Sequence, residues 1–133
     1  MEKIKLTIEV EVGEEKIAEL FSTAFYGGVN YWCSRCINDS IPKEIKEYNL
    51  SYEDELAKCL FTYPDYSFKI MEGDEYDDSI DVHSITLDKI QNGLNKMAID
   101  SPEIMSSFLE DGFDAQIADC VFQYIVFGEI IYG

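Results

Sequence analysis

The sequence predicts an α+β fold, in which a mostly antiparallel sheet packs against several helices. Some stretches alternate apolar and polar residues as strands do, others carry apolar residues at helical spacing, and a short acidic turn joins two strand-like runs into a hairpin. The chain has 133 residues, of which 47% are hydrophobic. We therefore expect a single domain over residues 1–133 with a core of its own.

The first part of the chain predicts a strand, a helix and a second strand. Residues 3–11 alternate strictly, which is typical of a half-buried strand. Residues 14–28 follow with apolar residues at helical spacing, and Gly27-Gly28 should end this helix as a left-handed cap. Residues 29–37 are aromatic and β-prone, which predicts a strand. In the first strand the apolar residues are Ile4, Leu6, Ile8 and Val10, and the polar ones are Lys3, Lys5, Thr7, Glu9 and Glu11.

The middle of the chain predicts a loop, a helix and a hairpin. Residues 37–49 contain a proline and several turn formers, which favours a loop. Ser51 and Asp54 have the spacing of a capping box, so a helix should run from there to about Phe61. The next predicted element is a hairpin over residues 66–85.

The last part of the chain predicts three helices and a final edge strand. Thr86 and Ser101-Pro102 begin two of the helices, because Thr and Ser are good N-caps and Pro suits the first helical position. The third helix is apolar nearly all round, which is typical of a buried helix. The helices are expected at 87–99, 102–110 and 114–128, and the strand at 129–133.

The charge of the chain is strongly negative. Ten Lys and Arg stand against 27 Asp and Glu, giving a net charge of −17. Such a charge repels nucleic acid and anionic membranes, so the sequence argues against direct binding to either. The N-terminal residues lack the apolar core of a secretion signal, and no apolar run approaches the ~20 residues that cross a bilayer. We therefore expect a cytoplasmic protein with reduced cysteines.

The cysteines form a CxxC pair, Cys33 and Cys36, and two single residues, Cys59 and Cys120. A structural zinc site needs four ligands, usually from two close pairs, and here the second pair is missing and His83 is the single histidine. A redox pair would open a helix, whereas this CxxC lies in a predicted strand. The sequence therefore predicts no metal and no cofactor.

The turn of the predicted hairpin is densely acidic. Its carboxylates do not follow the order of ligands in an EF-hand calcium loop. They are either a solvated hairpin tip or a contact surface for Lys and Arg of a basic partner, which would relieve the crowding of like charges. The candidate partner-binding residues are Glu72, Asp74, Glu75, Asp77, Asp78 and Asp81.

A second candidate site surrounds the glycine pair. Tyr31 and Trp32 could stack on the base of a nucleotide-type signal molecule, while the backbone of Gly27-Gly28 approaches a phosphate and Arg35 pairs with it. The alternative is that these aromatic residues, like those near the C-terminus, pack in the core. The C-terminal aromatics are also compatible with a homodimer, because periodicity does not separate a core face from an interface face.

The segments TAFYGGVNYWC (residues 23–33) and DCVFQYIVFGEIIYG (residues 119–133) resemble a set of small acidic phage and prophage proteins. These share a TAxxGGxxYW segment and a QYxxFGExxxG ending. The resemblance implies a mobile-element protein that acts inside a bacterial host, where small acidic phage proteins are often inhibitors of host defence.

No catalytic motif is recognisable in the sequence, so an enzyme is not expected. The first hypothesis is a phage-type binding protein that inhibits a basic host protein, such as a nuclease or other defence factor, through its acidic surface. An anti-CRISPR role or nucleic-acid mimicry belongs to this class. The second hypothesis is a module that sequesters a nucleotide-type immune signal. A third, an enzyme with a cysteine nucleophile, ranks last.

Overall fold

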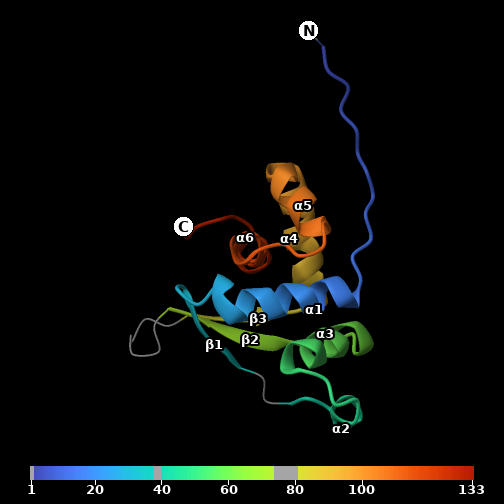
Figure 1. Cartoon of the computed structure of the whole chain (residues 1–133), viewed down its shortest axis with the longest axis vertical. Coiled ribbons are helices and arrows are strands. Elements are labelled where there is room, and N and C mark those ends of the chain that lie inside the picture. Colours follow the sequence, from blue (N-terminus) through green and yellow to red (C-terminus); the bar gives the residue numbers. More distant parts are fainter. Residues whose placement is uncertain (1, 38–39, 74–80) are drawn as a thin grey trace.

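The computed structural model describes residues 2–37, 40–73 and 81–133, and it has the expected α+β fold (Figure 1). Over these residues six α-helices accompany a three-stranded sheet. The helices are α1 (Glu14–Thr23), α2 (Lys43–Lys46), α3 (Tyr52–Thr62), α4 (Leu87–Asp100), α5 (Pro102–Leu109) and α6 (Ala115–Phe127).

The sheet is antiparallel, with the strands in the order β1-β2-β3. The strands are β1 (Cys33–Ile37), β2 (Phe68–Glu72) and β3 (Asp81–Ile85). Ile70 at the centre of β2 pairs with Cys36 on one side and His83 on the other. The predicted strands of the hairpin are confirmed, and the turn between them lies outside the described residues.

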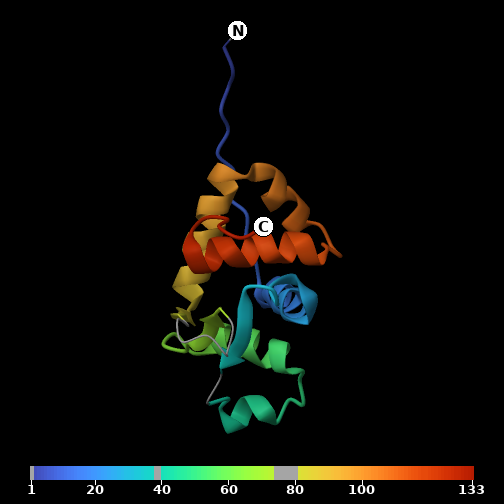
Figure 2. The same cartoon turned by 90° about the vertical axis from the view of Figure 1, so that its left-hand side faces the viewer.

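Helix α1 lies between the sheet and α6 (Figure 1). Its Phe21 is fully buried and meets Phe68 of β2 and Phe122 of α6 edge-on, with ring centroids 5.3 and 6.3 Å apart. Helices α1 and α6 cross steeply, since α6 is seen end-on in Figure 1 and lengthwise in Figure 2. One aromatic core therefore joins the sheet to the helical layer.

Two helix starts that the sequence predicts are confirmed by their caps. The Ser51 hydroxyl accepts a hydrogen bond from the backbone N–H of Asp54 at 3.3 Å, and the Thr86 hydroxyl accepts one from Lys89 at 3.1 Å. Each cap satisfies a backbone donor at the first turn, which has no partner within the helix. The short helix α2 was not predicted, because its few residues lie in a segment that is rich in turn formers.

The strand predicted at residues 3–11 is wrong. This segment is extended (Figure 1), but it pairs with no strand among the described residues, and its apolar side chains are exposed. The alternating pattern predicts an extended chain with one apolar face, but it does not supply a neighbouring strand. Ile4 is 90% exposed, Leu6 79%, Ile8 75% and Val10 54%.

The edge strand predicted at residues 129–133 is also wrong. The backbone N–H groups of Ile131 and Tyr132 both donate to the side-chain oxygen of Gln123, each at 2.9 Å. The side chain of Gln123 thus supplies the hydrogen-bond acceptor that a neighbouring strand would supply. The chain end folds back along α6. The strand predicted at 29–37 is confirmed only from Cys33 onward, because residues 30–32 form a turn.

Candidate functional site

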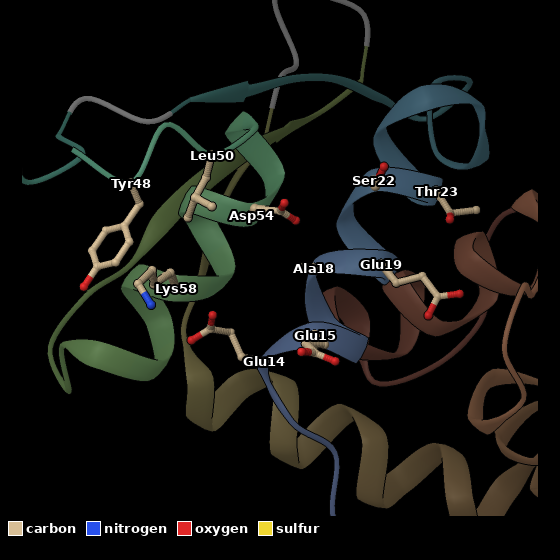
Figure 3. Close-up of a pocket in the computed structure, with 10 residues that line it drawn as sticks. All are labelled: Glu14, Glu15, Ala18, Glu19, Ser22, Thr23, Tyr48, Leu50, Asp54 and Lys58. Carbon is tan, nitrogen blue, oxygen red and sulfur yellow. The ribbon is translucent and has the colours of Figure 1, made fainter. Parts of the chain in front are cut away.

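An acidic groove of about 470 Å³ runs between α1 and α3 (Figure 3). Asp54 points from α3 toward α1, where three glutamates follow one another along the helix. The groove thus collects four carboxylates and a single lysine. Its lining residues are Glu14, Glu15, Ala18, Glu19, Ser22, Thr23, Tyr48, Leu50, Asp54 and Lys58.

Most of the negative charge in the groove is not balanced inside the molecule. The Lys58 ammonium lies over the ring of Tyr48, 4.6 Å from its centroid. Among the described residues Glu19 has an ion pair, with Lys16 at 3.5 Å, while Glu14, Glu15 and Asp54 have none. Three carboxylates therefore remain free to receive the guanidinium or ammonium groups of a partner.

The predicted acidic hairpin is described only at its two ends. Glu72 closes β2 and Asp81 opens β3, and the two residues are cross-strand partners. Asp81 is exposed, whereas Glu72 is half-buried. The remaining candidates lie outside the described residues: Asp74, Glu75, Asp77 and Asp78.

The carboxylate of Glu72 is engaged within the chain. One of its oxygens lies 2.7 Å from His83 Nε2, and the other accepts a hydrogen bond from the Tyr132 hydroxyl. Desolvation alone would raise the pKa of Glu72, but the hydrogen bonds from Tyr132 and His83 outweigh it and leave the pKa lowered. Glu72 therefore ties the hairpin to the C-terminus.

Glu72→Gln should make the stability of the protein less sensitive to acid. Because the folded-state pKa of Glu72 is lowered, its contribution is present above the unfolded pKa and is lost as the pH falls through the folded pKa. We expect the variant to be about 1 kcal/mol less stable at pH 7. Urea unfolding at several pH values should show this difference shrinking below about pH 4.5. A difference that stays constant down to pH 2.5 would contradict the role given to Glu72.

A buried carboxylate on α6 holds the two aromatic residues that follow the glycine pair. Asp119 is only 8% exposed. It accepts hydrogen bonds from the Tyr31 hydroxyl at 2.5 Å, from Trp32 Nε1 at 2.7 Å and from Gln123 Nε2 at 2.9 Å. Desolvation and then the hydrogen bond to Asp119 raise the pKa of Tyr31 to about 12. Trp32 is 2% exposed and stacks on the ring of Tyr132, with centroids 5.6 Å apart.

The glycine pair brings these aromatics to α6. Gly27 has a φ of +146°, which residues with a side chain rarely adopt, and it ends the helical run. Gly28 is buried, and a Cβ atom there would lie 2.9 Å from the backbone oxygen of Ala115 at the start of α6. Gly27 therefore serves the turn and Gly28 the close contact between two backbones.

The nucleotide-binding alternative stays a prediction, and the structure adds a condition to it. Trp32 is buried between Asp119 and Tyr132, so it would have to leave both partners before it could stack on a base. Gly28 faces the backbone of α6 rather than open space. Arg35 lies in β1, where it pairs with Met71 of β2.

None of the four cysteines forms a disulfide in the described structure, and within the described ranges no group of three His, Cys, Asp or Glu side chains is arranged to hold a metal ion. Cys33 is buried, and Cys36 lies beside Tyr52, with 3.6 Å between sulfur and hydroxyl oxygen. Burial raises the pKa of Cys36, Cys59 and Cys120. These three thiols are therefore protonated near neutral pH, when they are poor nucleophiles.

The sequence interpretation missed the residues that organise this region. Asp119 and Gln123 lie four positions apart on α6, whose other faces are apolar, so both side chains fall on one side of the helix. Two polar residues at this spacing in a buried helix are the signal that would have pointed to them. The acidic groove was missed because its residues come from two separate helices.

No protein family, curated protein or solved structure matches this chain. Over the part of the chain that the structure describes, no helix is both long and apolar enough to cross a membrane.

Proposed function

We propose that this chain is a non-enzymatic, phage-type binding protein that inhibits a host defence factor in the bacterial cytoplasm. The partner is a basic host protein, such as a nuclease, and the inhibitor acts by covering its basic surface. An anti-CRISPR role, or another anti-defence role that uses nucleic-acid mimicry, falls within this proposal.

The observation that carries the proposal is the acidic groove between α1 and α3. Carboxylates held on two rigid helices present negative charge in a fixed arrangement, as a phosphate backbone does. A basic partner would relieve the repulsion among Glu14, Glu15 and Asp54, and the net charge of −17 would speed its approach. The segments at residues 23–33 and 119–133 resemble small acidic phage proteins, and this resemblance is the reason for placing the protein inside a bacterial host.

Capture from a bacterial lysate tests the proposal. The immobilised full-length protein should retain a basic protein at low ionic strength and release it at high ionic strength, because salt screens charges beyond a Debye length of about 10 Å at 0.1 M. A variant with the groove neutralised should lose this partner. Its substitutions are Glu14→Gln, Glu15→Gln, Glu19→Gln and Asp54→Asn.

A second variant distinguishes the effect of the groove carboxylates from the effect of the net charge of the protein. It neutralises four exposed acids outside the groove, so both variants have a net charge of −17 + 4 = −13. This control variant should retain the partner as the unmodified chain does. Equal loss from both variants would show that the groove has no special role. The control substitutions are Asp65→Asn, Asp88→Asn, Glu103→Gln and Glu129→Gln.

A further inference from the structure

The N-terminal arm, residues 3–11, carries a row of apolar side chains that the fold leaves exposed. It runs from the start of α1 past α5, and its N-terminal end stands clear of the helices in both views (Figures 1 and 2). Its four apolar side chains, Ile4, Leu6, Ile8 and Val10, are each more than half exposed. A continuous apolar strip of this kind marks an interaction surface.

The polar face of the arm is positively charged at its N-terminal end and negatively charged at its C-terminal end. Lys3 and Lys5 precede Thr7, and Glu9 and Glu11 follow it at the same spacing. All five side chains are exposed in the single chain. The order of charges is therefore antisymmetric about Thr7.

We infer that the arm pairs antiparallel with the same arm of a second copy, with Thr7 on the two-fold axis. In this register Lys3 faces Glu11 of the other copy and Lys5 faces its Glu9, so every charged side chain meets an opposite charge. Cross-strand pairs of opposite charge stabilise a sheet, and like charges destabilise it. A two-fold contact uses the same surface on both subunits, as this arm requires.

The other arrangements satisfy fewer charges. A parallel, in-register pair would place lysine against lysine and glutamate against glutamate. An antiparallel pair shifted by two residues would bring Lys5 or Glu9 against Thr7 and would leave a charged residue at the end without a partner. The sequence of the arm thus selects both the direction and the register.

The two paired arms would form a two-stranded ribbon, and its apolar face can pack into a groove beside α4. Residues 8 and 10 of the arm line an apolar groove of about 730 Å³, whose opposite wall is formed mainly by α4. The proposed register places Ile4 of the second copy beside Val10 and its Leu6 beside Ile8. These two side chains would occupy part of the groove, and the contact would cover part of the exposed strip.

Sedimentation equilibrium of the full chain tests the inference. We expect a dimer of twice the 15.3 kDa chain mass. Lys3→Glu with Lys5→Glu creates four like-charge contacts and should raise the dimer dissociation constant at least about tenfold. Adding Glu9→Lys and Glu11→Lys reverses the order of charges and should restore the dimer. A monomer at all concentrations, an unaffected double variant or a failure of the fourfold variant to dimerise would each overturn the inference.

Disulfide cross-linking tests the register independently. With Cys36 and Cys120 replaced by serine, Thr7→Cys should form a covalent dimer, because directly opposite residues in an antiparallel pair have Cα atoms about 4.5–5.5 Å apart. Lys3→Cys alone should not cross-link with itself, whereas Lys3→Cys mixed with Glu11→Cys should. Cross-linking of Lys3→Cys as efficient as that of Thr7→Cys would indicate a parallel pair and overturn the proposed register.

Discussion

Replacing Gly93 with alanine is expected to lower the free energy of unfolding by about 3 kcal/mol. Gly93 is buried in the middle of α4, where α4 crosses α6. A Cβ atom at this position would lie 2.6 Å from the Cα atom of Ile125 and 2.7 Å from the backbone oxygen of Tyr124. Both atoms belong to the backbone of α6, so a side-chain rotation cannot relieve the clash, and the helices would have to move apart.

The prediction for Gly93→Ala is informative because helix propensity alone would predict the opposite change in stability. In an exposed helix, alanine is about 1 kcal/mol more favourable than glycine. Asn92→Ala, at the exposed neighbouring position in α4, is the matched control and should leave stability within about 0.5 kcal/mol. Chemical denaturation of the two variants measures both values. If Gly93→Ala were as stable as the unmodified chain, the close packing of α4 on α6 would be wrong.

Asp119→Ala is expected to destabilise the protein by a similar amount, about 3 kcal/mol. The substitution removes the acceptor of three hydrogen bonds, which come from Tyr31, Trp32 and Gln123. The Trp32 indole N–H is buried, so it would lose its partner without gaining water. Unfolding by denaturant, followed by the fluorescence of the single tryptophan, measures the loss.

A double-mutant cycle measures whether Tyr31 and Asp119 are coupled, and so distinguishes the loss of their hydrogen bond from the loss of the carboxylate alone. Tyr31→Phe alone should cost about 1 kcal/mol, and it should cost much less in the Asp119→Ala background, because the acceptor is already absent. Glu129→Ala, an exposed acid just after α6, is the control and should have little effect. Additive costs for Tyr31 and Asp119 would show that the two side chains are not coupled.

The sequence predicts those parts of the fold that depend on local signals. The caps at Ser51 and Thr86 place two helices, and alternation places the strands of the hairpin. Residues 3–11 and 129–133 are predicted wrongly because a strand needs a neighbour, and alternation carries no information about where that neighbour lies. At the chain end, Gln123 satisfies the backbone instead.

The candidate site was less predictable than the fold. The acidic turn stands out in the sequence because its carboxylates are close together in the chain. Of its two described ends, Asp81 is exposed and Glu72 is bound by His83 and Tyr132. The groove draws Glu14 and Asp54 together from positions 40 residues apart, and only the packing of α1 against α3 creates it. In the segment TAFYGGVNYWC, Tyr31 and Trp32 lie together because both donate hydrogen bonds to Asp119. The role of this segment in nucleotide binding stays a prediction.

The most direct test of the proposed function is the affinity of the captured host partner for three forms of the protein at several salt concentrations. We predict that the unmodified chain and the control variant bind the partner within about threefold of each other. The groove variant should bind at least about tenfold more weakly, with a smaller dependence on salt, since it has lost the charges that contact the partner. Equal affinities for the groove variant and the control variant would contradict the proposal that the groove between α1 and α3 binds the partner.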